Sequence, residues 1–204
     1  MLKSPYSGKF IVLEGLDGAG KSTQAALLAN DLSLNGKKAC LTREPSQFST
    51  GGIVRSRLLN EWQSSPECLQ LLFAADRAEH LEKEVFLRLQ EGAAVVCDRY
   101  FLSSLAYGAV DSDLEWLAQI NSRFVAPDLM IYLNMPANVC ADRILANGKS
   151  VELFERVEIL EKVAQNYGKA MKMFENEMDI AVVDGNKKRE DVFGDIKKLI
   201  ENVI

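Results

Sequence analysis

One segment near the start of the chain restricts the possible folds more than any other. Gly15-Leu-Asp-Gly-Ala-Gly-Lys-Ser22 follows an apolar run at residues 10–13 and precedes a helical pattern that begins at Lys21. It matches the pattern G-x-x-x-x-G-K-[ST], in which small residues let successive backbone N–H groups turn inward around a phosphate. The lysine can reach the terminal phosphates and the serine hydroxyl can ligate Mg²⁺. The segment therefore predicts a loop that binds a nucleoside triphosphate.

The rest of the chain alternates apolar runs of strand length with helical patterns. We expect strands at 10–13, 39–42, 93–97, 129–133 and 180–183, and helices at 21–34, 66–90, 102–122, 136–146, 154–175 and 189–203. The strand runs show no regular apolar–polar alternation, which is typical of a parallel sheet covered on both faces. The order predicts a three-layer α/β fold, a five-stranded parallel sheet flanked by helices. Ligands bind such sheets at the carboxyl ends of the strands.

Composition excludes several classes of protein. The chain has 204 residues, and 24 Lys+Arg against 29 Asp+Glu give a net charge of −5, which argues against a nucleic-acid binder with a positive field. It has no apolar run of membrane-spanning length, and the segment at residues 1–9 is short and polar, so we expect no secretory signal and a cytoplasmic protein without a membrane partner. Without a repeat or linker, residues 1–204 are expected to form one domain.

Cysteine and histidine positions give no metal-binding pattern. His80 is the single histidine, and we expect it to be a structural, hydrogen-bonding residue. The four cysteines lie far apart in the sequence and are expected to be reduced and mostly buried: Cys40, Cys68, Cys97 and Cys140.

A phosphate loop alone does not say how the nucleotide is used. A GTPase would carry an Asn-Lys-x-Asp motif, but the nearest match, Asn186-Lys-Lys-Arg189, lacks the aspartate. A partitioning ATPase would carry a lysine early in the loop, where this chain has Leu16. A second anion-binding surface would instead favour a kinase.

Charged residues at the expected strand ends supply candidates for that second surface. Arg43 and Arg99 follow the second and third strands, and Asp98 ends the third strand, where it could hold Mg²⁺ together with Ser22. Phe73 lies four residues before Arg77, so both project from one helix face and suit a base and a phosphate. Taken alone, Phe73 is more often a core residue, and an arginine such as Arg77 is more often exposed and paired with a carboxylate.

Taken together, these segments resemble the thymidylate kinase family, nucleoside-monophosphate kinases of the P-loop class. The resemblance covers essentially the whole chain and is carried by residues 15–23, 42–45, 73–80 and 98–107, in the family's order. It implies a P-loop kinase fold and ATP-dependent phosphorylation of dTMP to dTDP in thymidine nucleotide biosynthesis. It also implies ATP and Mg²⁺ as donor and cofactor, and a homodimer.

The resemblance also implies residue roles. Lys21 and Arg99 would be catalytic, and Ser22 and Asp98 would hold the metal. In the acceptor site, Phe73 would stack on thymine, Arg77 would reach the thymine edge, and Ser104 would contact the base. Asp17 would approach the sugar 3′-hydroxyl, and Tyr107 would crowd the 2′ position. Arg43 and Arg99 would bind the acceptor phosphate. The ATP-binding residues would be Gly15, Leu16, Asp17, Gly18, Ala19, Gly20, Lys21, Ser22 and Thr23.

Two positions depart from the family pattern. The family often has glutamine where Gly108 stands, so base discrimination would be weaker or would be handled elsewhere. In the short lid expected at about 146–153, Leu153 occupies the place of an arginine, and the lid pattern looks more like the archaeal branch. We expect Lys149 to serve as the catalytic lid cation, although a solvated loop lysine fits nearly as well.

Two alternative functions stay open: another nucleoside-monophosphate or deoxynucleoside kinase, or a P-loop ATP-binding regulatory protein.

Overall fold

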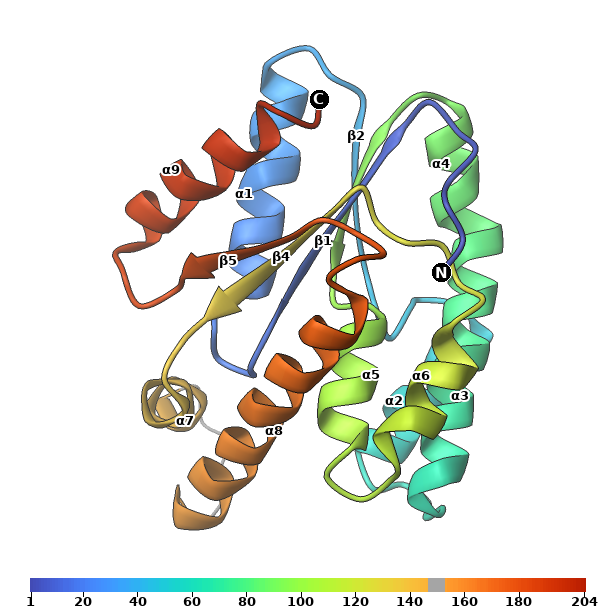
Figure 1. Ribbon diagram of the computed structural model, residues 1–204, viewed down its shortest axis with the longest axis vertical. Helices are drawn as coiled ribbons and strands as arrows, with labels where there is room; N and C mark the ends of the chain where they lie inside the picture. Colours follow the sequence, from blue (N-terminus) through green and yellow to red (C-terminus); the bar gives the residue numbers. More distant parts are fainter. Residues whose placement is uncertain (147–152) are drawn as a thin grey trace.

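A parallel five-stranded sheet forms the centre of the molecule (Figure 1). The structure is a computed structural model that describes residues 1–146 and 153–204. The strand order is β2-β3-β1-β4-β5, and every neighbouring pair is parallel. The strands are β1 (Lys9–Gly15), β2 (Ala39–Arg43), β3 (Ala94–Asp98), β4 (Leu129–Asn134) and β5 (Ile180–Asp184). The fold and the five strands predicted from the sequence are therefore confirmed.

Helices cover both faces of this sheet. On one face α1 packs against α9, and on the other α5 packs against α8 (Figure 1). All five residues of β3 are buried between these layers, which explains why its sequence shows no polar alternation. The helices are α1 (Lys21–Leu34), α2 (Ser49–Leu58), α3 (Pro66–His80), α4 (Phe86–Gln90), α5 (Phe101–Gly108), α6 (Leu114–Asn121), α7 (Ala137–Ala146), α8 (Leu153–Phe174) and α9 (Arg189–Ile200).

Three helical segments differ from the sequence expectation. The helix expected at 66–90 is interrupted by a π-helical segment, η1 (Leu81–Val85), between α3 and α4. The helix expected at 102–122 is two helices, because the Asp113 side chain accepts a hydrogen bond from the Trp116 amide at 2.8 Å and caps a new start. Helix α2 was not expected, since it contains Gly51 and Gly52. Gly51 is needed there because a Cβ would collide with the carbonyl oxygen of Ser46.

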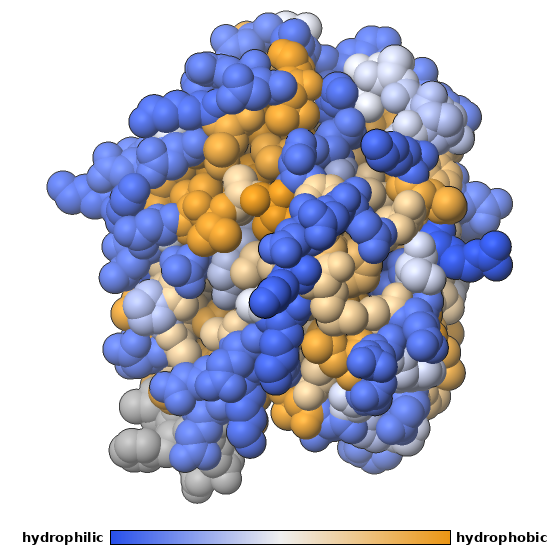
Figure 2. All heavy atoms as spheres, in the orientation of Figure 1, coloured by the Kyte–Doolittle hydropathy of each residue, from blue (hydrophilic) through white to orange (hydrophobic). Residues whose placement is uncertain are grey.

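The cysteines are all free, as predicted, but they differ in exposure. Cys97 and Cys140 are buried, whereas Cys40 is half-buried and Cys68 is exposed, so the expectation of mostly buried thiols holds for only half of them. Within the described ranges, no helix is long and apolar enough to cross a membrane. The face drawn in Figure 2 is largely hydrophilic, with apolar patches between the charged side chains.

Candidate active site

The phosphate loop connects β1 to α1 with a backbone that only small residues can form. Gly15, Gly18 and Gly20 have positive φ angles of 147°, 84° and 95°. Gly18 also approaches α7 closely, since a Cβ there would lie 2.6 Å from the carbonyl oxygen of Cys140. The side chains of Leu16 and Ala19 are buried in the core, so these two residues can offer a ligand only their backbone.

A first cavity of about 500 Å³ opens above this loop. It contains the cation of Lys21, the hydroxyl groups at the start of α1 and the guanidinium of Arg143 from α7. Backbone N–H groups at a helix N-terminus and nearby cations bind anions, so the cavity suits a chain of phosphates. Its lining residues are Asp17, Gly18, Gly20, Lys21, Ser22, Thr23, Arg99, Arg143 and Ala146.

Lys21 is held close to the loop that it serves. Its side chain is buried, and Nζ donates a hydrogen bond to the carbonyl oxygen of Leu16 at 2.7 Å. Burial, and then the positive charge of Arg99, lower the pKa of Lys21 to about 8. The charged form is therefore held weakly until an anion enters the cavity.

Ser22 and Asp98 lie together, as the sequence suggests for a metal site. The Ser22 hydroxyl donates a hydrogen bond to Oδ2 of Asp98. The other carboxylate oxygen, Oδ1, is buried and has no hydrogen-bond partner in the described part of the chain. A hydroxyl beside a carboxylate with a free oxygen fits a hydrated divalent cation such as Mg²⁺.

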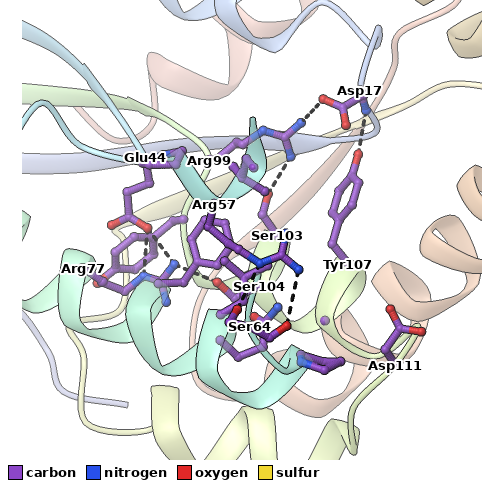
Figure 3. A pocket seen from close by; sticks show the side chains of 18 residues that line it. Asp17, Glu44, Arg57, Ser64, Arg77, Arg99, Ser103, Ser104, Tyr107 and Asp111 are labelled. Atoms are coloured by element: carbon purple, nitrogen blue, oxygen red, sulfur yellow. Dashed lines mark hydrogen bonds and ion pairs between the residues drawn. The ribbon is translucent and has the colours of Figure 1, made fainter. Parts of the chain in front are cut away.

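A second cavity of about 350 Å³ lies between α2, α3 and α5 (Figure 3). Its walls combine aromatic rings, serine hydroxyl groups and several arginines. This mixture suits a planar base with a sugar and a phosphate attached. The lining residues are Asp17, Glu44, Pro45, Arg57, Leu58, Ser64, Pro66, Leu69, Gln70, Phe73, Arg77, Arg99, Tyr100, Ser103, Ser104, Tyr107, Gly108 and Asp111.

Asp17 and Arg99 line both cavities. The Arg99 guanidinium contacts Oδ1 of Asp17 at 2.6 Å and lies over the Tyr107 ring, 5.2 Å from its centroid. The Tyr107 hydroxyl accepts a hydrogen bond from the Asp17 amide at 2.8 Å (Figure 3). Arg99 has a φ angle of 73°, an uncommon conformation for a residue other than glycine. The chain thus fixes a cation where the two cavities meet.

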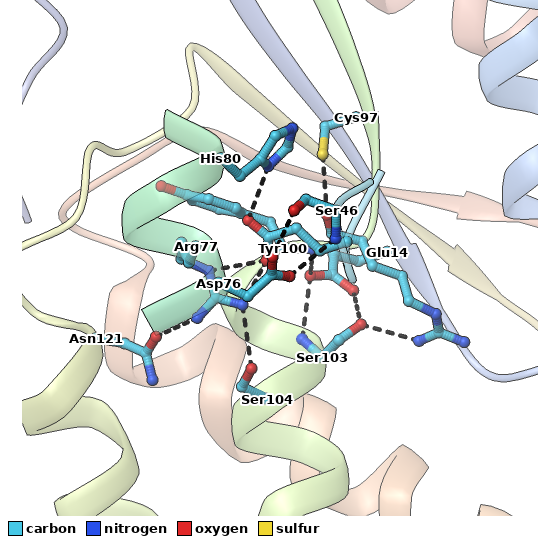
Figure 4. Close-up of polar contacts among 12 residues, drawn as sticks. Glu14, Ser46, Asp76, Arg77, His80, Cys97, Tyr100, Ser103, Ser104 and Asn121 are labelled. Carbon is cyan, nitrogen blue, oxygen red and sulfur yellow. Dashed lines mark hydrogen bonds and ion pairs between the residues drawn. The ribbon is translucent and has the colours of Figure 1, made fainter. Parts of the chain in front are cut away.

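Glu14 orients Arg99 through a serine. Its buried carboxylate accepts hydrogen bonds from the Tyr100 and Ser103 amides and from the Ser103 hydroxyl (Figure 4). The same Ser103 hydroxyl accepts a hydrogen bond from Nη1 of Arg99 at 2.9 Å. Burial raises the pKa of Glu14, and the hydrogen bond from Ser103 offsets only part of that increase. Since the hydroxyl hydrogen goes to Glu14, the serine oxygen is left to receive Arg99.

Arg77 is buried rather than an exposed helix residue. It is 1% exposed, and its Nε and Nη2 donate to Oε2 of Glu44 at 3.0 and 2.6 Å (Figure 3). Nη2 also donates to the Ser104 hydroxyl at 3.1 Å, and Nη1 donates to Asn121. The paired guanidinium forms part of the cavity wall. His80 contacts the other Glu44 oxygen at 3.2 Å, which confirms its predicted hydrogen-bonding role.

Two cations predicted from the sequence, Arg43 and Lys149, are not among the described residues that line the two cavities. Arg43 stands at the end of β2, opposite Asp98 in the neighbouring strand, but it is exposed and lines neither cavity. Lys149 and most of the expected lid at 146–153 lie outside the described residues.

Several residues that line the cavities were not predicted from the sequence, and Arg57 and Gln70 are two of them. Arg57 belongs to the unexpected helix α2, and its Nε donates to the Ser64 hydroxyl at 3.0 Å. Gln70 lies three residues before Phe73 in α3. The helical spacing of Gln70, Phe73 and Arg77 was the signal that could have identified Gln70.

Comparisons with known proteins agree with this geometry. The sequence model of the family described as "Thymidylate kinase" matches residues 13–196. A probable thymidylate kinase of Pyrococcus horikoshii is 43% identical over 201 residues, which cover 96% of this chain and 97% of the relative. One from Thermococcus gammatolerans is 41% identical, with 97% and 98% covered, and one from Methanococcus aeolicus is 39% identical, with 96% and 98% covered. These relatives are archaeal, in line with the lid pattern noted in the sequence.

Proposed function

Because the chain belongs to the thymidylate kinase family, we propose that it transfers the terminal phosphoryl group of ATP to dTMP and forms dTDP. The observation that carries this proposal is the meeting of two cavities at Asp17 and Arg99. Two separate nucleotide sites that share one cation are what transfer between two bound phosphates requires. From the family resemblance we also expect a homodimer in the cytoplasm, built from one domain per chain with a lid at about 146–153.

In the first cavity, ATP would bind with its phosphates on the loop. The N–H groups of residues 15–23 would surround the phosphates, and Lys21 would contact the terminal ones. Ser22 and Asp98 would hold Mg²⁺, which would neutralise phosphate charge as transfer proceeds. Arg143 lines this cavity and is a further cation within reach of the donor.

In the second cavity, dTMP would bind with its base between α3 and α5. Phe73 offers a ring for stacking, and Arg77 and Ser104 offer polar groups to the base edge. As the family resemblance implies, we expect the Tyr107 ring to crowd a 2′-hydroxyl and Asp17 to approach the sugar; both residues line this cavity. The acceptor phosphate would then lie against Arg99. Arg43, exposed at the sheet edge, would have to turn inward to assist.

Phosphoryl transfer depends mainly on positioning and on neutralisation of charge in a loose, in-line transition state. The acceptor phosphate is ionised near pH 7, so it needs no dedicated general base. In the structure Arg99 pairs with Asp17, and a bound phosphate would replace part of that contact. Arg99 would then stabilise the transferring group from the junction of the two cavities.

One assay separates this proposal from its alternatives. ADP release with ATP and Mg²⁺ is measured with dTMP, dUMP, UMP, CMP, AMP or thymidine as acceptor. We expect dTMP to give the highest kcat/KM. Faster turnover of another monophosphate or of thymidine would assign a different kinase, and ATP hydrolysis without any acceptor dependence would favour the regulatory ATP-binding protein.

Lys21 predicts a pH dependence for ATP binding. Free Lys21 has a pKa of about 8, so it loses its proton as the pH rises above that value. Bound phosphates favour the charged form, so ATP binding must take up a proton there. We expect the Kd for ATP to be constant at pH values well below 8 and to rise about tenfold per pH unit above it.

Calorimetry at pH 8.5 in two buffers of different ionisation enthalpy measures this proton uptake. The Lys21→Met variant serves as the reference, and it should bind ATP more weakly with no uptake. Equal uptake in both proteins would contradict the assignment of the proton to Lys21.

A further inference from the structure

Gln70 is a cavity residue whose side-chain oxygen has no hydrogen-bond partner within residues 1–146 and 153–204. It is 7% exposed and lines the second cavity on the same face of α3 as Phe73 and Arg77. Its side-chain oxygen, Oε1, is buried and accepts no hydrogen bond from any described residue. A buried amide oxygen without a donor is unfavourable. Because the protein covers this oxygen, the carboxamide has to turn toward the cavity before a ligand donor can reach it and relieve that cost.

Gly108 leaves the space that this amide occupies. A Cβ at Gly108 would lie 2.8 Å from Cδ and 3.0 Å from Oε1 of Gln70, and 3.0 Å from Cδ1 of Leu117. The backbone of Gly108 is ordinary helix at the end of α5, so conformational freedom does not explain the glycine. The missing side chain on α5 therefore allows the carboxamide to enter from α3. The family often has glutamine at position 108, and in this chain the side chain of Gln70, on the facing helix α3, lies next to that position.

Two polar side chains that line the same cavity as Gln70, Arg77 and Ser104, are already hydrogen-bonded to each other. Arg77 can only donate, and it is held by Glu44, Asn121 and Ser104. The Ser104 hydroxyl already accepts from Arg77. An amide oxygen and an arginine in the wall of one cavity can offer a ligand an acceptor and a donor. That pattern is complementary to the imide edge of thymine or uracil, where N3–H donates and the carbonyl oxygens accept.

We propose that Gln70 recognises the imide edge of the pyrimidine in the acceptor site, with Oε1 accepting a hydrogen bond from N3–H. The proposal rests on the proposed function, because it names the base that the second cavity selects. Cytosine presents an acceptor at N3 and a donor at C4, the reverse of thymine. With its amide oxygen, and not its NH2 group, turned toward N3, Gln70 thus selects thymine and uracil over cytosine.

The first test removes the hydrogen bond but keeps the size of the side chain. Gln70→Met should raise the KM for dTMP and for dUMP about tenfold, with a smaller effect on kcat. The preference for dTMP over dCMP should fall by a similar factor. Gln119→Met, at an exposed position on α6, is the matched control and should change none of these values. An unchanged preference in Gln70→Met would overturn the proposal.

The second test changes the ligand instead of the protein. A methyl group on N3 of dTMP removes the donor, so the wild-type protein should bind N3-methyl-dTMP at least about tenfold more weakly than dTMP. Gln70→Met has no acceptor to lose, and its ratio of the two Kd values should be much closer to one. The same ratio in both proteins would show that Gln70 does not contact N3.

The first test measures turnover and the second measures binding by calorimetry, so the two proposals fail separately. A wild-type protein without dTMP-dependent ADP release would contradict the proposed function. A wild-type protein that is active on dTMP, but whose selectivity survives Gln70→Met, would contradict only the role of Gln70. Thermal unfolding of each variant confirms that a loss of binding is not a loss of fold.

Discussion

Replacing Arg99 with methionine is expected to lower kcat with dTMP about 10³-fold, in the range found for arginines that stabilise phosphoryl transfer. The guanidinium stands at the junction of the two cavities, fixed by Asp17, Ser103 and the Tyr107 ring. Methionine keeps much of the length of the side chain but removes its charge and donors. Single-turnover measurement of dTDP formation would give this loss without a contribution from product release.

ATP affinity should change far less than kcat in the same variant, because Lys21 and the loop remain. Arg99 is one cause of the lowered pKa of Lys21, so its removal should move the onset of weaker ATP binding to higher pH. Arg123→Met, at an exposed position, is the control. Arg43→Met tests whether the exposed arginine of β2 takes part in the reaction. A loss in ATP affinity as large as the loss in kcat would contradict a role of Arg99 in transfer.

The sheet and the phosphate loop could be predicted from the sequence because both depend on local patterns. Each strand run is apolar over consecutive residues, and Gly15, Gly18 and Gly20 mark positions that adopt positive φ angles. Helix α2 was not predicted because glycine has low helix propensity. Gly51 is needed there because a Cβ would collide with the carbonyl oxygen of Ser46, which is a packing requirement that the sequence pattern does not show.

The state of the site residues depends on partners far away in the sequence. Arg77 is buried because Glu44, 33 residues earlier, lies beside it in the folded chain. The orientation of Arg99 requires Glu14, which contacts Ser103 across 89 residues. Spacing within one segment identifies candidates such as Phe73 and Arg77, but it does not show which carboxylate pairs with which cation. Lys149 remains a prediction.

The overall charge of the chain also conceals the charge of its site. The net charge is −5, yet the cations of both cavities gather at one edge of the sheet: Lys21, Arg57, Arg77, Arg99 and Arg143. Arg99 is paired with the Asp17 carboxylate, and Arg77 is paired with the Glu44 carboxylate. Anionic substrates would compete with the exposed Asp17, but not with the buried Glu44. Arg99 is therefore suited to bind and release phosphate, whereas Arg77 is suited to hold a fixed position.

The buried pair of Arg77 and Glu44 predicts a large loss of stability when one partner is removed. Arg77→Met leaves the Glu44 carboxylate, 4% exposed, without its main cation. Removal of one member of a buried ion pair costs about 3–5 kcal/mol, so we expect the free energy of unfolding to fall by that amount. Urea denaturation followed by circular dichroism measures it.

A double variant, Arg77→Met/Glu44→Gln, separates the structural role of Arg77 from its contact with the base. The Glu44→Gln change removes the unpaired charge, and the amide that it introduces can still hydrogen-bond to His80, so most of the lost stability should return. If Arg77 also contacts thymine, the KM for dTMP should stay high in this stabilised protein while ATP affinity is normal. Recovery of both stability and dTMP affinity would show that Arg77 only supports the cavity wall. The selection of the base would then depend on the residues beside it, with Gln70 and Ser104 as the remaining polar contacts.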